Sequence, residues 1–418
     1  MKTANLSCVS LGLFIFSLSA AASEYADVTD IKLKTLATQT FTELEGQDNN
    51  SSAPVRPGSA APKEDPIVQI SSKSRDGKWM LGSVTEILSD SQEGAPDSRH
   101  FLAKNTNGEW TIGMVGDDNF YDLLRSAPDE VVGADLRRVL VQQMAADLPG
   151  GKDPSIQSES DANDTGLGLP YAIGAAWFSA GIHGDSGASR PYNSIDFDGG
   201  DGRVLAPADG VFQLTCRRGR SALVHLTHDN GLKTTYYHMT NLANISDGEK
   251  VEQGTYLGRI GNELPCGGRS SGAHVHFSLL QGARQLAVNN RKFGGWTFRE
   301  GGRAYSGSAV RNGRRISFPG GTLVNDGPSG STSRIKTDAK GTVRWERGAN
   351  IRESPSVSSA LIRTAPKGEV LSLKCYAEGD YFNGLWGRTN LWYQLVSGGW
   401  VSDGTIFTGK NTAVTPKC

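Results

Sequence analysis

The chain has 418 residues, a length that suits two or three domains. Its formal net charge is −1 and its hydrophobic fraction is 37%, values that favour neither a nucleic-acid-binding protein nor a membrane-embedded one. The 52 glycines indicate many turns and point to β structure.

Residues 1–22 carry the features of a secretory signal peptide. Lys2 supplies the positive start, residues 11–18 (LGLFIFSL) form the apolar core, and residues 20–22 offer a small-residue cleavage site. The apolar core is too short to span a bilayer, and Cys8 precedes it, which argues against a lipoprotein anchor. We therefore expect a secreted protein with no membrane anchor.

The next segment, residues 23–160, is predicted to be an α+β propeptide. Its expected elements are a helix near 32–44, a linker at 51–66, a strand at 78–84, a hairpin within 99–115 and a helix at 134–148. A polar stretch at 149–167 suits proteolytic release. A permanent N-terminal binding domain is the alternative interpretation.

Charge divides unevenly between the two parts of the chain. Residues 24–160 carry 13 Lys and Arg against 23 Asp and Glu, whereas residues 161–418 carry 29 against 21. A basic product would be steered toward an anionic surface, and an acidic leading segment would complement it before release.

Residues 161–325 contain short strands bounded by glycine and no long helical period, which predicts an antiparallel β domain. Within it, His274 and His276 lie two apart in an alternating run, so they share one face of a strand. With His183 and Asp196 upstream, a His, an Asp and a His can bind zinc and leave the fourth position to water. Two imidazoles would remain for proton transfer.

Other polar residues of this domain compete for these roles. Asp198 shares the strand face of Asp196 and is the serious competitor for the carboxylate position. Asp185 follows His183 by only two residues and fits neither spacing, and His225 and His228 are expected to be structural.

The pattern resembles the lysostaphin-type zinc metallopeptidases, most closely the branch of staphylolysin and the β-lytic proteases. The general motif His-x-x-x-Asp fails, because position 187 is Gly, but Asp196 fits the longer spacing of that branch. Further likeness lies in the stretches Tyr236-Tyr237-His238-Met239 and 272–279, and the resemblance covers about residues 168–320.

The resemblance implies a two-sheet groove with zinc on its floor. It assigns zinc to His183, Asp196 and His276, and catalysis to His238 and His274. It also implies a bacteriolytic endopeptidase that cleaves glycine-rich peptide cross-bridges of peptidoglycan. Peptidoglycan peptides and the chain's own propeptide are the expected partners, nucleic acid is not, and the protein is expected to be a monomer.

Four cysteines remain after removal of the signal peptide, and three pairings are possible. The pairing Cys216–Cys266 with Cys375–Cys418 keeps each bond within one domain, and the resemblance supports the first of these bonds. Zinc binding by Cys216 and Cys266 is the disfavoured alternative, since they lack close spacing.

Residues 340–410 resemble a bacterial Src-homology-3-like domain, which would be a small β-barrel that binds wall peptides. The resemblance lies in an Asn-x-Arg-x-x-Pro-Ser pattern at 350–356 and in the aromatic stretches near Trp392 and Trp400. Trp386 and Tyr393 are further candidates for a ligand groove, with core packing as the alternative.

Two rival functions use the same fold. A non-catalytic wall-binding or regulatory protein would lose metal ligands or catalytic histidines, whereas all five positions are filled here. A zinc carboxypeptidase would release a free terminal amino acid instead of making an internal cut.

Overall fold

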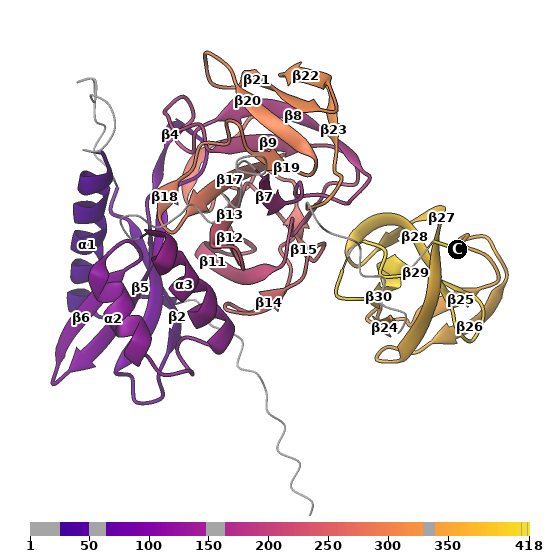
Figure 1. The fold of residues 1–418 in the computed structure, drawn as a ribbon. Helices are drawn as coiled ribbons and strands as arrows, with labels where there is room; N and C mark the ends of the chain where they lie inside the picture. Colours follow the sequence, from indigo (N-terminus) through magenta and orange to yellow (C-terminus); the bar gives the residue numbers. More distant parts are fainter. Residues whose placement is uncertain (1–25, 50–63, 148–163, 329–338, 411, 416) are drawn as a thin grey trace, which may run out of the picture.

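The computed structural model describes residues 26–49, 64–147, 164–328, 339–410, 412–415 and 417–418 (Figure 1). The predicted signal peptide, most of the linker at 51–66 and the polar stretch up to residue 163 lie outside the described residues. We refer below to an N-terminal unit (26–147), a central domain (164–328) and a C-terminal domain (339–418). The first and the last lie on opposite sides of the central domain in Figure 1.

The N-terminal unit is a sheet with helices on both faces. Leu33, Ala37 and Phe41 follow a helical spacing on α1 (Ile31–Asn49) and pack against one face of the sheet. Leu81 and Leu102 point to the other face, where α2 (Asp118–Ser126) and α3 (Ala134–Asp147) cover them. The sheet order is β1 (Ala26–Asp27), β2 (Ile67–Lys73), β3 (Trp79–Thr85), β5 (Ser98–Thr106), β6 (Glu109–Met114).

Helices α1 and α3 coincide with the helices expected at 32–44 and 134–148, and β5 and β6 form the expected hairpin. Helix α2 was not expected. It begins after Asp117, whose side chain accepts a hydrogen bond from the backbone of Asn119 and so satisfies a free N–H of the first turn.

The N-terminal unit packs against the central domain. Val211 of the central sheet belongs to the same apolar cluster as the buried residues of α2 and α3. Strand β4 (Leu88–Glu93) leaves the N-terminal unit and pairs in parallel with β16 (Gly267–Arg269) of the central domain. The two units therefore share both a core and a strand pairing.

The central domain is built on a nine-stranded sheet. Its path is β14 (Lys250–Val251), β11 (Gly210–Arg218), β12 (Ser221–His228), β13 (Leu232–Tyr237), β17 (Val275–Gln281), β9 (Ser194–Asp198), β8 (Ala176–His183), β23 (Thr322–Val324), with β18 (Arg284–Gln285) beside β17. A second sheet runs β22 (Arg314–Phe318), β21 (Gly307–Arg311), β20 (Trp296–Glu300), β19 (Lys292–Phe293), β7 (Asp164–Leu167). Strands β10 (Arg203–Leu205) and β15 (Tyr256–Arg259) form a separate pair.

Aromatic contacts join the two sheets of the central domain. Successive ring contacts connect Phe197, Phe277, Phe293, Phe298 and Phe318, all of them buried. These rings are contributed by β9, β17, β19, β20 and β22, so the core lies between the large sheet and the smaller one.

The C-terminal domain is a curled sheet with a small core of its own (Figure 1). Its strand order is β26 (Leu361–Ala365), β25 (Ala349–Arg352), β29 (Trp400–Ser402), β28 (Gly387–Leu395), β27 (Val370–Gly384), β24 (Lys340–Val343), β30 (Ile406–Phe407). Trp392 and Tyr393 are buried, so these two rings belong to the core and not to a ligand groove. The prediction of a mainly β protein is confirmed. In the described part of the chain, no helix has the length and apolarity needed to cross a bilayer.

Candidate metal centre

Three neighbouring strands bring the predicted metal ligands onto one face of the large sheet. In the register, His276 of β17 lies opposite Asp196 of β9, and Asp196 lies opposite Gly181 of β8. Because alternate residues of a strand share a face, His183 projects to the same side as Gly181 and therefore joins the other two.

The three side chains meet closely. His183 Nε2 and His276 Nδ1 each lie 3.1 Å from Oδ1 of Asp196. One ligand atom from each of the three residues fits within a spread of 4.8 Å, and all three residues are buried. Two atoms that each lie about 2.0–2.1 Å from a tetrahedral zinc are separated by roughly 3.3 Å, so the spacing suits one ion.

The protonation of His183 also fits a metal ligand. Its Nδ1 donates to the backbone carbonyl of Gly184 at 3.1 Å, which leaves a lone pair on Nε2. That Nε2 is buried and has no hydrogen-bond partner, although it faces the carboxylate of Asp196. A buried polar atom without a partner is costly, and a metal ion between His183 and Asp196 would satisfy it.

Asp185 supports the centre from outside, a role that the spacing of the sequence did not reveal. Its Oδ1 lies 2.9 Å from His276 Nε2 and also accepts hydrogen bonds from the hydroxyls of Ser194 and Ser278. Asn193 donates to its other oxygen at 2.7 Å. A carboxylate on the far nitrogen of a histidine fixes the ring and leaves the near nitrogen to the metal.

The charge of the centre favours a cation. Burial raises the pKa of Asp196, but His183 and His276 outweigh burial and hold that pKa well below its usual range. Burial lowers the pKa of His276, whereas its hydrogen bonds to Asp185 and Asp196 outweigh burial and raise the pKa to about 9. Asp185 and Asp196 are therefore both ionised although they are buried, and their negative charge favours the binding of a divalent cation.

Two more imidazoles stand beside the cluster. The rings of His238 and His274 have centroids 4.7 Å apart, and His274 Nε2 lies 3.6 Å from Oδ1 of Asp196. His238 Nδ1 donates to the backbone carbonyl of Glu263 at 3.1 Å, and His274 Nδ1 donates to that of Gly272 at 2.7 Å. Each ring therefore keeps Nε2 available as an acceptor. Burial, followed by the charge of His274, lowers the pKa of His238 to about 3.

Comparison with known proteins identifies the family. The sequence model of Peptidase family M23 matches residues 190–289. The beta-lytic metalloendopeptidase of Lysobacter enzymogenes is 30% identical over 179 residues, which cover 39% of this chain and 97% of that protein. The chain belongs to peptidase family M23.

Two further similarities accompany this match. Protease LasA of Pseudomonas aeruginosa is 30% identical over 154 residues, and the match spans 34% of this chain but only 36% of LasA. The solved structure of the M23 metalloprotease pseudoalterin, from the deep sea, is 35% identical, with 38% of this chain and 97% of that one covered and a TM-score of 0.34. The expected kinship with lysostaphin-type metallopeptidases is confirmed.

Tyr305 is a second residue of the M23 site that the sequence did not indicate. Its ring stacks on the ring of His183 with centroids 4.2 Å apart, and its hydroxyl donates to Glu93 Oε2 at 2.9 Å. The close approach of this loop requires Gly181, because a Cβ there would lie 2.7 Å from the carbonyl carbon of Tyr305. A contact between segments that lie far apart in the sequence cannot be predicted from the spacing of neighbouring residues.

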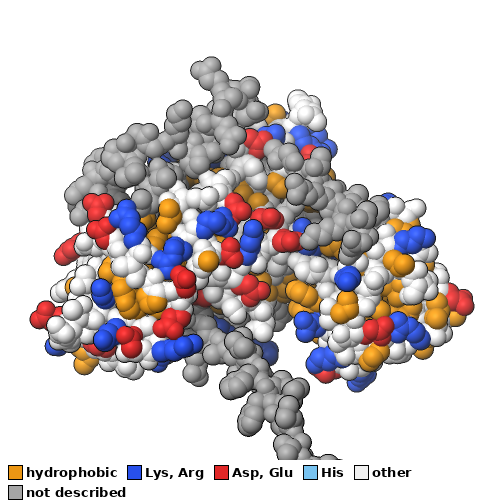
Figure 2. Space-filling view, turned by 60° about the horizontal axis from the view of Figure 1, so that its bottom comes forward, with side chains coloured by type: hydrophobic (Ala, Val, Ile, Leu, Met, Phe, Trp, Pro, Cys, Tyr) orange, Lys and Arg blue, Asp and Glu red, His pale blue; other side chains and the backbone are white. Residues whose placement is uncertain are grey.

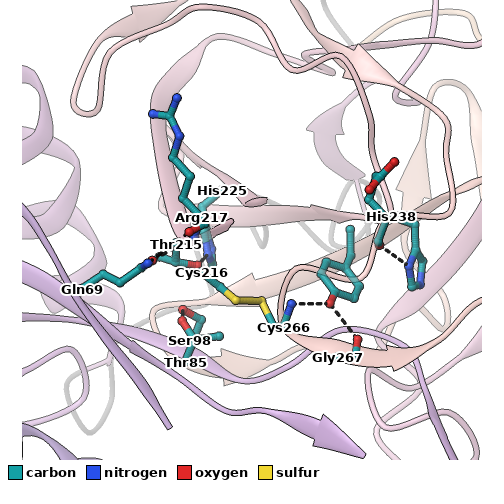
Figure 3. The surroundings of a disulfide bond; sticks show 12 residues. Gln69, Thr85, Ser98, Thr215, Cys216, Arg217, His225, His238, Cys266 and Gly267 are labelled. Atoms are coloured by element: carbon teal, nitrogen blue, oxygen red, sulfur yellow. Dashed lines mark hydrogen bonds between the residues drawn. A yellow bond between two sulfur atoms is a disulfide. The ribbon is translucent and has the colours of Figure 1, made fainter. Parts of the chain in front are cut away.

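A disulfide supports the strand end that carries His238 (Figure 3). Cys216 is bonded to Cys266, and the hydroxyl of Tyr237 accepts from the backbone N–H of Cys266 at 3.0 Å and donates to the carbonyl of Gly267 at 2.9 Å. Cys375 is bonded to Cys418, so both bonds follow the nearest-neighbour pairing. Residues of the N-terminal unit, Gln69 among them, lie beside the first disulfide in Figure 3.

The competing residues occupy other positions. Asp198 lies two residues beyond Asp196, where burial raises its pKa. His225 bonds the hydroxyl of Thr215, and His228 bonds the backbone carbonyl of Asp209, so both are held within the sheet. Within the described residues, the one His, Cys, Asp and Glu group with metal-binding geometry is His183, Asp196 and His276.

Proposed function

We propose that this M23 peptidase is a secreted zinc metalloendopeptidase that hydrolyses the glycine-rich peptide cross-bridges of bacterial peptidoglycan. The observation that carries the proposal is the buried cluster of His183, Asp196 and His276, with two further imidazoles beside it. The name of the relative from Lysobacter enzymogenes, a beta-lytic metalloendopeptidase, supports the reaction. The preference for glycine rests on the sequence resemblance alone.

In this proposal the ligand atoms are His183 Nε2, Asp196 Oδ1 and His276 Nδ1. A zinc ion held there would lower the pKa of a bound water toward neutrality and polarise the scissile carbonyl. Asp185 keeps the ring of His276 in the orientation that presents Nδ1.

His238 and His274 are proposed to move protons. A general base must be unprotonated before it acts, and burial, by lowering the pKa of His238, keeps this imidazole neutral at neutral pH. One ring takes the proton of the attacking water, and the other stabilises the oxyanion or protonates the leaving amine. The backbone carbonyls of Glu263 and Gly272 orient both rings for this work.

The N-terminal unit is proposed to be a propeptide that keeps the enzyme latent. Glu93 accepts a hydrogen bond from Tyr305 and forms an ion pair with Arg269. The next residue, Gly94, approaches the backbone oxygen of Asp185 so closely that any side chain there would collide with it. Residues 93 and 94 thus lie on the rim of the metal centre, which supports a role in restricting access.

Export and wall binding complete the proposal. The signal features of residues 1–22 and the two disulfides support secretion, since disulfides persist in oxidising compartments. The C-terminal domain is proposed to be a Src-homology-3-like module that binds the wall, within the predicted limits 340–410. We further propose a monomer with domain limits at 23–160 and 161–325.

The test is lysis of Gram-positive cells by the protein after removal of the N-terminal unit, followed as loss of turbidity. We expect lysis that a chelator stops and zinc restores. His274→Ala should abolish it, whereas Arg314→Ala, an exposed residue of β22, should not. Lysis that survives both the chelator and His274→Ala would reject the enzyme.

The rival functions give different products. Purified peptidoglycan that is bound but never cut would indicate a non-catalytic wall-binding protein. Release of free terminal amino acids, seen by mass spectrometry in place of internal fragments, would indicate a carboxypeptidase.

A further inference from the structure

A cavity between the central and C-terminal domains is lined by arginines. It has a volume of about 770 Å³ and opens among the β11–β12 turn, the loop 241–245, strand β15 and the β27–β28 hairpin. Figure 1 shows the C-terminal domain beside the β14–β15 side of the central domain. We call this cavity the arginine groove.

Four arginines line the arginine groove: Arg217, Arg220, Arg259 and Arg388. The described residues that line it include no Asp or Glu, and its other polar side chains are asparagines and a tyrosine. On the face drawn in Figure 2, by contrast, Lys and Arg are interspersed with Asp and Glu. A concave site lined by one sign of charge concentrates ions of the opposite sign.

The contacts of Arg259 and Arg388 leave the charge of these two residues in place. Arg259 donates to the backbone carbonyl of Asp201 at 2.6 Å, and Arg388 lies over the ring of Tyr381 at 4.1 Å. A carbonyl dipole and an aromatic face position a guanidinium without neutralising it. Arg220 is exposed at the β11–β12 turn.

Both domains contribute to the groove, and their contact is specific. Arg217, Arg220 and Arg259 belong to the central domain, whereas Arg388 and Trp386 belong to the C-terminal domain. Thr255 donates to the backbone carbonyl of Gly409 at 3.1 Å, and the rings of Tyr256 and Trp386 lie 6.3 Å apart. A ligand in the groove would therefore touch both domains at once.

The segment around Arg259 also connects the groove to the strands of the central domain. Thr240, two residues after His238, pairs with Arg259 in an isolated bridge, and Gly261 pairs with His274 in another. The segment that carries Arg259 therefore pairs with the backbone next to both candidate catalytic histidines.

We propose that the arginine groove binds a phosphodiester polymer, a chain of phosphates joined by polyol or sugar units. Planar guanidinium forks match phosphate oxygens in pairs, and several of them in one cavity match several anions in series. Trp386 and Tyr256 offer apolar surface to the carbon units between phosphates. Such polymers are attached to Gram-positive walls, and this biological source, unlike the binding itself, rests on the proposed function.

The test measures binding by the full chain, with no hydrolysis involved. The probe is a short fluorescent glycerol-phosphate oligomer, followed by anisotropy at several salt concentrations. We expect saturable binding that Arg220→Glu and Arg388→Glu each weaken by about tenfold or more, with a shallower salt dependence. Arg314→Glu makes the same charge change at an exposed site on β22 and should alter binding by less than about twofold.

Other results would overturn the inference. One is the absence of saturable binding of the oligomer to the wild type. Another is a loss of affinity in Arg314→Glu equal to that in the groove variants, which would indicate general charge attraction. A third is arginine-dependent binding of a carboxylate-bearing stem peptide without binding of the phosphate oligomer. Arg388→Gln removes the charge without adding an opposite one and separates a local effect from misfolding. Because wall lysis is measured separately, failure here leaves the proposed peptidase untouched.

Discussion

Asp185 and His276 form a buried pair in which Oδ1 of the carboxylate lies 2.9 Å from Nε2 of the imidazole. The other nitrogen of the same ring faces Asp196 at 3.1 Å. The ring is therefore held between two carboxylates, one as the proposed fellow ligand and one as the support that orients it.

Replacing Asp185 tests this support. Asp185→Asn keeps the size of the side chain but removes its charge, so the ring of His276 loses its fixed orientation and its basicity. We expect zinc affinity to fall about 10- to 100-fold, measured by competition with a chelating dye. Asp122→Asn, at an exposed position on α2, is the matched control and should bind zinc like the wild type. Equal affinities for all three proteins would contradict the role of Asp185.

Metal binding should stabilise the fold. The three proposed ligands converge only in the native chain, so zinc binds the folded state in preference to the unfolded one. Zinc at a hundred times its Kd should add about 2.7 kcal/mol to the free energy of unfolding. A chelator should remove this gain in the wild type, and His183→Ala should show no zinc-dependent gain, as measured by thermal unfolding. A full zinc response in His183→Ala would argue for a site elsewhere.

Glu93 links the N-terminal unit to the rim of the metal centre, so its replacement should loosen latency. Glu93→Gln weakens the contacts with Tyr305 and Arg269, of which Arg269 is largely exposed. A partly exposed ion pair contributes up to about 1 kcal/mol, which corresponds to a gain in activity of about two- to fivefold. The measurement is cleavage of a fluorogenic glycine peptide by the uncleaved chain.

Glu109→Gln is the control for this experiment, because Glu109 lies exposed in the β5–β6 hairpin. An equal rise in both variants, or none in Glu93→Gln, would mean that latency depends on other contacts.

Acid should destabilise the junction between the N-terminal unit and the central domain. His100 of β5 and His225 of β12 are both buried there, with ring centroids 5.6 Å apart. Burial, together with the charge of Lys233, lowers the pKa of His100 to about 3. An unfolded histidine has a pKa of about 6.5, so between these values the unfolded chain binds more protons than the folded one.

Neutral His100 makes a contribution to the free energy of unfolding. This contribution is fully present above pH 6.5 and is lost as the pH falls toward 3. The slope is about 1.4 kcal/mol per pH unit for this group. In His100→Phe, the free energy of unfolding, measured with denaturant, should therefore fall less steeply between about pH 6 and about pH 4 than in the wild type. An unchanged slope would show that His100 does not set the acid response, and Tyr381→Phe, at an exposed position, serves as the control.

The alternation of the strands predicted which residues share a face, but it left Asp196 and Asp198 as alternatives, so the proposed ligand set came from the family resemblance. His276 and Asp196 face each other through strand register, and His183 joins them by the same two-residue period. The mainly β fold could be predicted from the sequence, because the expected strands are short and bounded by glycine.

The supporting residues were not predictable, because their roles depend on contacts between distant segments. Asp185 reaches His276 across 91 positions of sequence, and Glu93 reaches Tyr305 across 212. The pairing of β4 with β16 is likewise a product of the packing of two units. Helix α2 escaped prediction because it has only nine residues, and a short apolar run cannot be assigned to helix or strand by its pattern alone.

The most direct test of the central claim is anomalous X-ray diffraction at the zinc absorption edge from crystals of the full chain grown with zinc. The account predicts a single strong peak within bonding distance of His183 Nε2, Asp196 Oδ1 and His276 Nδ1, and no such peak in crystals of His276→Ala. A peak bound to other residues, or its persistence in His276→Ala, would contradict it.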